Sequence, residues 1–454
     1  MLFGQALPET VLGEQALEIP IAGWLVGAAA KASSIQVTID GESVAGLSLH
    51  APLPPRMCSG MSNKVEGISF STWVSLPAEH SDRTYELSID YALDGSRRQI
   101  HRQSHRRIPE PIAVKDSDVN IAICMAVYEP RRERLERQIE SIRNQTCQNW
   151  ICIICDDSSS QSSLETIQQV VGDDHRFHCH RNRHNLGFYH NFEKAISLVP
   201  ESIPYIALAD QDDFWYPEKL ERLVEEISLT DAALVYSDMR ITDTDRKELA
   251  ASYWQFRKNN YRDFQTLLVA NTITGAASVF RSELRRKLLP FPPRVGDAFD
   301  DHWIGCCALV FGGIGYVDQP LYDYIQYDDS VIGHCGFEEI SQVGKGIMLR
   351  SLFNPRNWRS LAGRLIGSSL AVYWHECRRI EAICKTLKSR GLHDKTRVGE
   401  IKLFSGGFKS WWLLVKFHLR LSESRRFTNN AELRLARGYF IHSFLNIFPS
   451  LRGF

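Results

Sequence analysis

The feature that most constrains this fold is a run of four short strand-like segments. They are spread over residues 119–210 and separated from one another by stretches of helical periodicity. In chain order the segments are VNIAICMAV, NWICIIC, RFHCHRN and IPYIALAD. Continuous apolar runs of this length are typical of strands that are buried on both faces of a parallel sheet. The alternation predicts an α/β domain with a mostly parallel sheet, helices on both of its faces and right-handed crossovers.

Each of the four segments ends in polar or charged residues. In chain order these ends are VYE at 127–129, DDS at 156–158, NRHNLG at 182–187 and DQDD at 210–213. The carboxyl ends of parallel strands meet at one edge of a sheet, and ligands of open α/β sheets bind at that edge. We therefore expect one site there, assembled from four separate parts of the chain.

The fourth strand end carries the strongest chemical signal. Asp210 and Asp212 stand two residues apart directly after an apolar strand. Carboxylates beside a buried strand are costly unless a cation neutralises them, and a hard divalent cation such as Mg²⁺ or Mn²⁺ also keeps positions for phosphate oxygens. Two alternatives stay open. The acids could cap the next helix, with Asp213 as the cap, or form a calcium loop, which Trp215 disfavours because it stands where glycine is required.

Other motifs narrow the choice of ligand. The chain has no G-x-G-x-x-G and no G-x-x-x-x-G-K-[ST] sequence, which disfavours a dinucleotide site and a P-loop. Cys152 and Cys155 lie inside an apolar segment and have no second pair at zinc spacing. Asp156 and Asp157 alone would more often be structural residues of a turn or a cap than functional ones. Their place beside three other polar strand ends makes a functional role the better hypothesis.

The motifs AVYEP, CDDSSS, NRHNLGFYHNFEKA and LADQDDFWYPEKL stand in the order and spacing of the family-2 glycosyltransferases with a GT-A fold. The element DQDDFWYPEKL resembles the bacterial rhamnosyltransferase-like branch of that family. The resemblance covers about residues 119–335. It implies an inverting transferase that takes a sugar from a nucleotide-diphosphate donor, linked to dTDP, UDP or GDP. The acceptor would be a cell-surface glycan or a lipid-linked molecule, as in O-antigen, lipopolysaccharide or similar polysaccharides.

The resemblance also implies residue roles on the donor side. Asp210 and Asp212 would hold Mg²⁺ or Mn²⁺ on the donor phosphates, and His334 in the closing segment would approach the same ion. The chain departs from the family at VYE, where T-Y-N is usual. The residues implied in nucleotide-sugar binding are Val127, Tyr128, Glu129, Asp156, Asp157, Asn185, Gly187, Asn191, Asp210 and Gln211.

The segment FDDHWIGCCALV resembles the acceptor-side helix of the family. Asp301 matches the acid that acts as the general base, and Asp300 is the second choice. Trp215, His302 and Trp303 are expected on the acceptor side. Residues 300 and 301 could instead be N-caps of an apolar helix, a role that Asp often takes.

The pattern changes on both sides of this domain. Short alternating segments with turn signals at Asp40-Gly41 and Asp94-Gly95 predict strands near the start of the chain. We expect four parts: a β-sandwich accessory domain at 1–106, a linker at 107–118, the GT-A domain at 119–340 and a basic amphipathic helical region at 341–454.

A net charge of −1 hides a strong asymmetry. Residues 341–454 hold 21 Lys and Arg against 6 Asp and Glu, while the rest of the chain holds 32 against 48. In SWWLLVKFHLRL and ELRLARGYFIHSFLNIF, basic residues alternate with large apolar ones, as in helices that lie in a membrane interface. We expect this region to bind an anionic membrane surface and not nucleic acid, which would favour a more polar face.

The amino-acid composition also predicts where the protein is located in the cell. No window reaches the roughly 18 apolar residues of a spanning helix, and IPIAGWLVGAAA is too short for an anchor or a signal peptide. Eleven cysteines, an odd number, favour a reducing compartment. We expect a cytoplasmic protein that is peripheral on the inner face of the cell membrane.

Two other function classes stay open. A nucleotidyltransferase on a related sheet would be expected to carry a glycine-rich basic loop after the first strand, but VYEPRRERLERQ has no glycine. A non-catalytic glycan-binding protein would bind without turnover and would be indifferent to Asp301→Asn.

Overall fold

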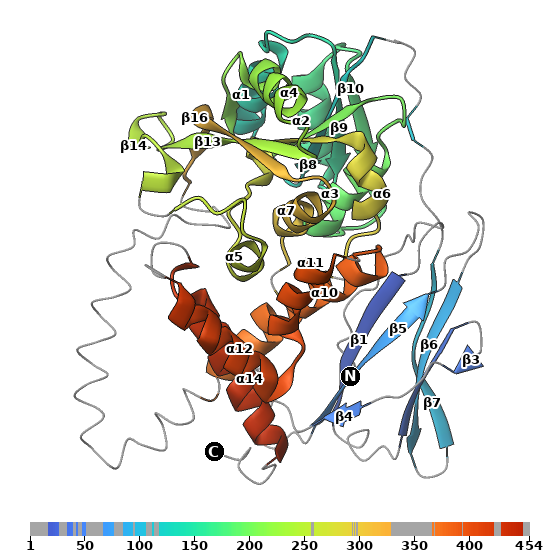
Figure 1. Ribbon diagram of the computed structural model, residues 1–454. Coiled ribbons are helices and arrows are strands. Elements are labelled where there is room, and N and C mark those ends of the chain that lie inside the picture. Colours follow the sequence, from blue (N-terminus) through green and yellow to red (C-terminus); the bar gives the residue numbers. More distant parts are fainter. Residues whose placement is uncertain are drawn as a thin grey trace, which may run out of the picture.

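The computed structural model of the protein (Figure 1) describes 17–105 only as strands, with the rest of that stretch left out. It further describes residues 111–112, residues 118–327 except 256–257, 293, 295 and 297, and residues 366–447 except 367, 393 and 422–427. His334 lies outside the described residues, so its predicted approach to the metal stays a prediction.

A nine-stranded sheet forms the centre of the described α/β part, in the order β10-β9-β8-β11-β15-β13-β16-β12, with β14 paired to β13. Six strands run in one direction, and only β12, β14 and β15 run against them. This confirms the predicted α/β fold with a mostly parallel sheet. The strands are β8 (Ile121–Val127), β9 (Trp150–Asp156), β10 (Phe177–Arg181), β11 (Tyr205–Ala209), β12 (Phe214–Trp215), β13 (Leu234–Thr242), β14 (Glu248–Ala250), β15 (Ser278–Arg281) and β16 (Ile314–Ile325).

Helices cover both faces of this sheet, with α1, α2 and α4 on one side and α3 and α7 on the other (Figure 1). The first helix shows why: Leu135, Ile139 and Ile142 recur at helical spacing and are fully buried. The helices of this part are α1 (Arg132–Arg143), α2 (Gln161–Val171), α3 (Phe188–Ser197), α4 (Lys219–Thr230), α5 (Phe264–Val269), α6 (Arg285–Leu288) and α7 (Asp300–Phe311).

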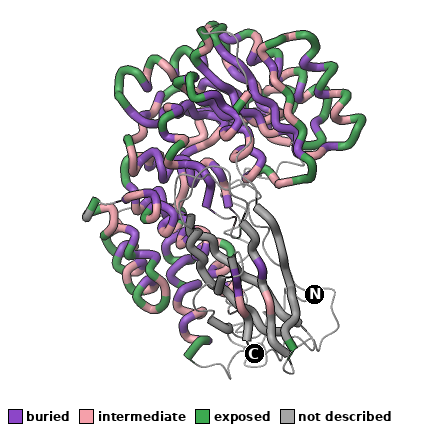
Figure 2. Tube along the Cα trace, turned by 90° about the vertical axis from the view of Figure 1, so that its right-hand side faces the viewer, coloured by how far each residue is buried: buried purple, intermediate pink, exposed green. Residues whose placement is uncertain are grey.

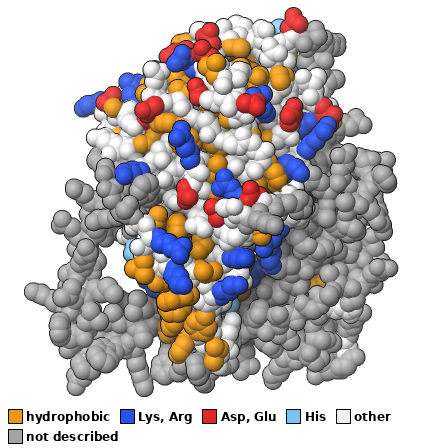
Figure 3. Space-filling view, viewed as in Figure 1, with side chains coloured by type: hydrophobic (Ala, Val, Ile, Leu, Met, Phe, Trp, Pro, Cys, Tyr) orange, Lys and Arg blue, Asp and Glu red, His pale blue; other side chains and the backbone are white. Residues whose placement is uncertain are grey.

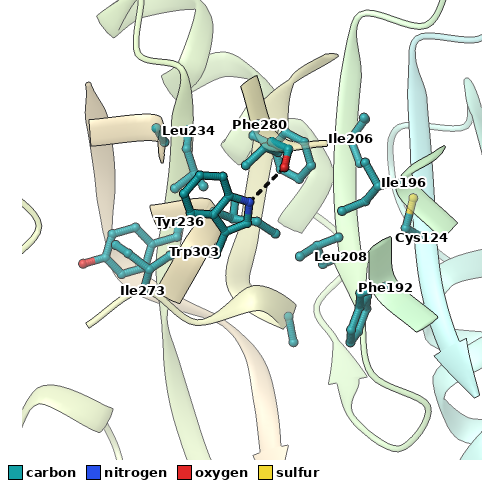
Figure 4. Close-up of a cluster of buried hydrophobic side chains, with 14 of the residues drawn as sticks. Cys124, Phe192, Ile196, Ile206, Leu208, Leu234, Tyr236, Ile273, Phe280 and Trp303 are labelled. Carbon is teal, nitrogen blue, oxygen red and sulfur yellow. Dashed lines mark hydrogen bonds between the residues drawn. The ribbon is translucent and has the colours of Figure 1, made fainter. Parts of the chain in front are cut away.

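The core lies between the sheet and these helices, where the tube in Figure 2 is mostly buried. Figure 4 shows Trp303 of α7 packed among apolar side chains of β11, β13 and β15, with its indole N–H donating to the carbonyl of Leu288 at 3.0 Å. Each large apolar side chain buried in this way stabilises the fold by about 1.5–3 kcal/mol. The core therefore fixes α7, which begins with Asp300 and Asp301, against the sheet.

The strands before residue 106 form two antiparallel sheets, β1-β5-β4 and β3-β2-β6-β7. Leu93 pairs with Ser96 and Ile39 with Glu42, so two hairpins stand at the predicted turns. The apolar IPIAGWLV is part of a strand. A single β-sandwich domain over 1–106 stays a prediction. The strands are β1 (Leu17–Val26), β2 (Ser34–Ile39), β3 (Glu42–Ser43), β4 (Ser48–His50), β5 (Gly67–Leu76), β6 (Tyr85–Leu93) and β7 (Ser96–His105).

The C-terminal helices pack onto the α/β part. The guanidinium of Arg390 is buried and donates to the carbonyls of Leu289 and Pro290, and Lys287 Nζ donates back to the Arg390 carbonyl at 2.9 Å. None of the described helices is long and apolar enough to cross a membrane. The elements are a π-helix (Tyr373–Cys377), α10 (Arg378–Ser389), α11 (Lys395–Ile401), α12 (Gly407–Arg420) and α14 (Ala431–Ile447).

Candidate active site

The ends of β8 and β11 are joined by a side-chain amide. The Tyr128 backbone N–H donates to Gln211 Oε1 at 2.9 Å, and Gln211 Nε2 donates to the Tyr128 carbonyl at 3.3 Å. This pairing extends the parallel ladder of the two strands by one link. The Gln211 side-chain amide is thus hydrogen-bonded to the Tyr128 backbone, whereas the Tyr128 ring lies outside the core with 52% of its surface exposed.

Asp157 organises the loop that follows β10. Its buried carboxylate accepts the backbone N–H groups of Leu186 at 2.7 Å and Gly187 at 2.8 Å. Gly187 has a φ of +76°, which favours glycine, and it is the N-cap of α3. The hydrogen bonds of the Asp157 carboxylate therefore position the start of α3.

Three asparagines complete this network. Asn182 Nδ2 donates to Asp157 at 3.0 Å and to Asn191 Oδ1 at 2.8 Å, while Asn191 Nδ2 donates to the Cys155 carbonyl at 2.8 Å. Asn185 Nδ2 reaches the Asp157 carbonyl at 3.2 Å. The structure thus brings together the predicted residues of the second and third strand ends.

Asp156 differs from Asp157 because one of its carboxylate oxygens has no hydrogen-bond donor among the described residues. The side chain is buried, and Oδ1 accepts the Ser159 N–H at 3.2 Å. Oδ2 lies 3.5 Å from Arg181 Nε but accepts no hydrogen bond from the described part of the protein. Val127 stands beside it in the β8–β9 register, and its carbonyl accepts the Asp157 N–H at 2.8 Å. Asp156 is therefore the carboxylate of this pair that keeps a free acceptor.

Glu129 is tied to the start of α2. Its carboxylate accepts the Ser160 N–H at 2.6 Å and the hydroxyls of Ser160 at 2.9 Å and Ser163 at 2.6 Å. The Ser163 hydrogen bond is the main cause that lowers the pKa of Glu129. Glu129 adopts a φ of +42°, so the strand end turns sharply to reach this helix. In this structure its described contacts are those of a helix cap.

The turn after β11 collects negative charge. Burial, followed by the charges of Asp212 and Asp301, raises the pKa of Asp210 to about 7. Asp213 is buried, its Oδ2 accepts no hydrogen bond from the described residues, and burial raises its pKa well above the ordinary range. The capping alternative for Asp213 is wrong, because Glu218 is the N-cap of α4.

Lys219, which the sequence analysis did not single out, is a buried cation beside this turn. Its Nζ donates to the Ala276 carbonyl and lies 3.5 Å from the centre of the Trp215 ring. Burial lowers the pKa of Lys219, whereas the charges of Asp213 and Asp210 oppose that shift. A lysine six residues after a row of acids was a usable signal, because a buried acid needs a counter-charge from somewhere.

Asp300 and Asp301 occupy the first turn of α7, whose N-cap is Phe299, so neither residue is the N-cap. Asn271 Nδ2 donates to Asp301 Oδ1 at 3.0 Å. Burial raises the pKa of Asp301 to about 7, while hydrogen bonds from the His302 and Gly275 backbones and from Asn271 act in the opposite direction. Donors that orient a carboxylate with a raised pKa suit it to act as a base near neutral pH.

Asn271 and Gly275 also escaped the sequence analysis. The Asn271 amide is locked to Ile273, because Oδ1 accepts the Ile273 N–H at 2.9 Å and Nδ2 donates to the Ile273 carbonyl at 2.9 Å. A Cβ on Gly275 would lie 3.5 Å from Asp300 Oδ2 and 3.7 Å from Asp301 Cβ. The polar, glycine-bearing sequence NTITG before an apolar strand was the available signal.

The fold brings two acidic segments of distant sequence together. The charges of Asp301 and Asp210 both raise the pKa of Asp300, and the charge of Asp301 raises that of Asp210. The turn after β11 and the start of α7 therefore face the same small volume. The predicted metal-side and base-side acids are neighbours in space.

The three residues predicted for the acceptor side are buried, as is usual for core side chains. Trp215 and Trp303 lie in the apolar core. His302 Nε2 lies 2.9 Å from the Leu267 carbonyl, and burial followed by the charge of Arg379 lowers the pKa of His302 to about 3. In this structure none of the three exposes a surface that an acceptor could contact, so they support the site from within.

The acidic side chains by themselves provide few ligands for a metal ion. Within the described ranges, no group of three or more His, Cys, Asp or Glu is arranged to hold an ion. Asp210 and Asp212 supply two carboxylates, and Asp212 Oδ2 lies 4.0 Å from Arg134 Nη1. One or two carboxylates plus substrate phosphates is the usual setting of Mg²⁺. The carboxylates of Asp210 and Asp212 therefore fit a divalent ion that binds together with a diphosphate group.

Comparison with known proteins agrees with this geometry. Residues 122–289 match the sequence model of glycosyl transferase family 2. An uncharacterized glycosyltransferase of Methanocaldococcus jannaschii is 25% identical over 193 residues, which are 41% of this chain and 64% of that protein. A putative teichuronic acid biosynthesis glycosyltransferase of Bacillus subtilis is 26% identical over 148 residues, which are 33% of this chain and 56% of that protein.

The chain therefore spans less than two thirds of the length of these two curated relatives. Among solved structures, S. aureus TarS 1-349 in complex with UDP-GlcNAc is 12% identical and covers 74% of this chain and 92% of its own, with a TM-score of 0.44. The family match covers the segment that holds β8, β9, β11 and the acidic turn, so residues 122–289 are similar to glycosyl transferase family 2.

Proposed function

We propose that the protein is an inverting glycosyltransferase. It would transfer a sugar, with rhamnose as the first candidate, from a nucleotide-diphosphate donor to a cell-surface glycan or a lipid-linked acceptor. The observation that carries the proposal is that Asp210 lies close enough to both Asp212 and Asp301 for their charges to raise its pKa. The family match and a relative named for teichuronic acid biosynthesis support the reaction and the acceptor class.

Donor binding would use the ends of β8 and β9. The exposed Tyr128 ring would stack on a nucleotide base, and the Asp156 oxygen that accepts no hydrogen bond from the described residues would accept one from the polar edge of that base. Asp157, Asn182 and Asn191 would hold the 182–187 loop in position for the ribose or the sugar.

Asp210 and Asp212 would hold Mg²⁺ or Mn²⁺ together with the donor phosphates. That ion would neutralise negative charge as the leaving group departs. The acceptor oxygen attacks the anomeric carbon, the bond to the nucleoside diphosphate breaks with its electron pair, and the acceptor proton passes to the Asp301 carboxylate. General-base assistance of this kind typically contributes about 10²–10⁴-fold to the rate.

Location belongs to the proposal as well. The basic C-terminal helices favour an anionic membrane surface, so the enzyme would work as a cytoplasmic, peripheral protein at the inner face of the membrane. Lipid-linked acceptors are presented at that face.

The test is a donor screen by calorimetry with dTDP-, UDP- and GDP-sugars, with and without Mn²⁺. The wild type should bind one donor class only with metal, Asp212→Ala should lose that binding, and Asp173→Ala, which removes an exposed acid away from the strand ends, should keep it. Donor binding that ignores both the metal and Asp212 would contradict the metal assignment.

Turnover separates the competing functions. A donor labelled in its sugar should pass the label to the acceptor, and Asp301→Asn should abolish that transfer while donor binding remains. Transfer of a label from the α-phosphate would indicate a nucleotidyltransferase instead. Binding without turnover, unchanged by Asp301→Asn, would indicate a glycan-binding protein.

A further inference from the structure

One face of α12 carries alternating basic and large apolar side chains. Residues 410, 414 and 417 are buried on its inner side. Its outer side follows the helical spacing of three and four residues, so these side chains form one continuous face. We call this face the α12 stripe, and it consists of Lys409, Trp412, Lys416, Leu419 and Arg420.

The apolar members of the stripe are unusually open to solvent. Trp412 keeps 50% of its surface exposed and Leu419 keeps 77%. Lys416 Nζ lies 5.1 Å from the centre of the Trp412 ring, so a positive charge lies directly beside exposed apolar surface. Single exposed apolar residues are common, but two on one face between three cations indicate a binding surface.

Negative charge is missing from this face. The sequence of α12 contains no Asp or Glu. The one acid of α14, Glu432, is buried and accepts from Thr428 and, at 2.7 Å, faces His418 Nδ1. Among the described side chains in Figure 3, basic and hydrophobic groups gather over the lower helices, and no acidic group is visible among them.

The neighbouring α14 continues the same character. Leu433, Ile447 and Arg437 are exposed on the outer side of this helix, and Arg434 there lies 3.3 Å from Glu376 Oε2. The helices hold each other through aromatic contacts, such as Trp411 against Phe440 with ring centres 5.2 Å apart. The pair is therefore a packed unit whose outer surface is basic and apolar.

We propose that the α12 stripe binds the surface of an anionic lipid bilayer. Trp412 and Leu419 would enter the boundary between headgroups and acyl chains, while Lys409, Lys416 and Arg420 would lie on lipid phosphates. A nucleic-acid face would be more polar, because phosphate contacts do not need exposed Leu or Trp. A second copy of this chain carries the same positive charge on this face and is repelled by it.

The C-terminal helices, which carry this surface, are attached to the α/β part that holds the candidate active site. Arg390, at the end of α10, is anchored to the carbonyls of Leu289 and Pro290, and the adjacent Leu288 carbonyl accepts the indole N–H of Trp303 on α7. Membrane contact would thus place the acceptor side of the enzyme near lipid-linked molecules. Only this consequence rests on the proposed transferase activity, because lipid binding itself needs no donor and no turnover.

The experiment is cosedimentation of the full chain with vesicles of phosphatidylcholine alone or mixed with phosphatidylglycerol. Wild type should bind the mixed vesicles, and the triple variant Lys409→Glu, Lys416→Glu, Arg420→Glu should bind at least roughly 100-fold more weakly, since each cation contributes about fivefold. Trp412→Ser with Leu419→Ser should also weaken binding, and this variant should keep its charge-dependent response to salt.

The matched control changes the same residue types on α4. Arg222→Glu with Leu229→Ser alters an exposed cation and a leucine with 75% of its surface exposed, and it should bind vesicles as the wild type does. Circular dichroism and thermal unfolding of every variant check folding without any donor, which keeps this test separate from the transferase proposal.

Two outcomes would overturn the proposal. The first is unchanged vesicle binding in both stripe variants. The second is a wild type that sediments as a dimer, with stripe variants that are monomers and still bind vesicles, because this result would assign the face to a second copy.

Discussion

At the scale of single residues, Asp301 depends on its partner Asn271. The Asn271 hydrogen bond lowers the pKa of Asp301, so Asn271→Ala should raise that pKa and move the acidic limb of the kcat/KM profile to higher pH. We expect kcat to fall by about 10–100-fold because the base loses its orientation. KM for the donor should change little. A pH profile of unchanged shape would show that Asn271 has only a structural role.

Asp301 also makes the stability of the protein depend on pH. Burial raises its pKa in the folded state to about 7, against about 3.9 in an unfolded chain. Its contribution is complete below the unfolded value and is lost as the pH rises through the folded value. Asp301→Asn should therefore gain a few degrees in Tm relative to wild type between pH 5 and pH 8, since about 1 kcal/mol is worth about 2–4 °C. The exposed Asp173→Asn should show a constant difference.

Lys219 gives a third prediction at this scale. Lys219→Met would leave Asp213 buried without its neighbouring cation, at a cost of about 3–5 kcal/mol in the free energy of unfolding. Asp213→Asn in the same chain should recover part of that loss. Denaturant unfolding of both single variants and the double variant measures the coupling, and additive losses would mean that the two groups do not interact.

The residue scale also shows what the sequence could reveal. The strand ends at Tyr128, Asp156 and Asp210 were predictable because the chain itself places them after apolar segments. Lys219 and Asn271 were not found because their roles come from contacts across the fold, with Ala276 and Asp301. Local patterns carry no information about such partners.

At the scale of elements, the first four strands of the sheet were predicted and the rest was not. From β8 to β11 every strand is parallel; β8, β9 and β10 are each followed directly by a helix, and β11 by the short β12 and then α4. After residue 209 the order changes, because β15 inserts antiparallel between β11 and β13, and β16 returns to pair with β12. Pairings that join strands about 40 to 110 residues apart have no local signature in the sequence.

The crossing of α14 and the π-helix gives a prediction at this scale. A Cβ on Gly438 would lie 3.1 Å from the Tyr373 N and 3.2 Å from the Cys377 Sγ. Gly438→Leu should force the helices apart and cost about 1–3 kcal/mol, with Gly438→Ala costing less. Thermal unfolding followed by tryptophan fluorescence measures this cost. Equal Tm values for the two variants would argue against close packing at this crossing.

At the scale of the whole molecule, the C-terminal helices were expected as a basic region in their own right, but α10 is held to the α/β part by Arg390. Charge and amphipathicity predicted the outer face of these helices. The inner face could not be predicted, because one buried arginine among many basic residues has no distinguishing sequence context. The boundary at residue 340 stays a prediction.

Arg390→Met tests this attachment. The variant loses two hydrogen bonds from a charged group to buried carbonyls, which should cost about 3–5 kcal/mol. We expect faster proteolysis of the C-terminal helices and a lower Tm. Lys388→Met, on an exposed position of the same helix, is the matched control and should behave as the wild type. Identical proteolysis of the two variants would contradict the anchoring role.

The late return of β16 has a consequence for synthesis. The acidic turn at 210–213 lies between β11 and β12, and β12 forms its ladder with Tyr322 and Asp323 of β16. A chain emerging from the ribosome must therefore carry this cluster of acids for more than a hundred residues before its closing strand exists. Until then Asp210, Asp212 and Asp213 stay hydrated and ionised, so the nascent chain postpones their burial until the strands that enclose them have been made.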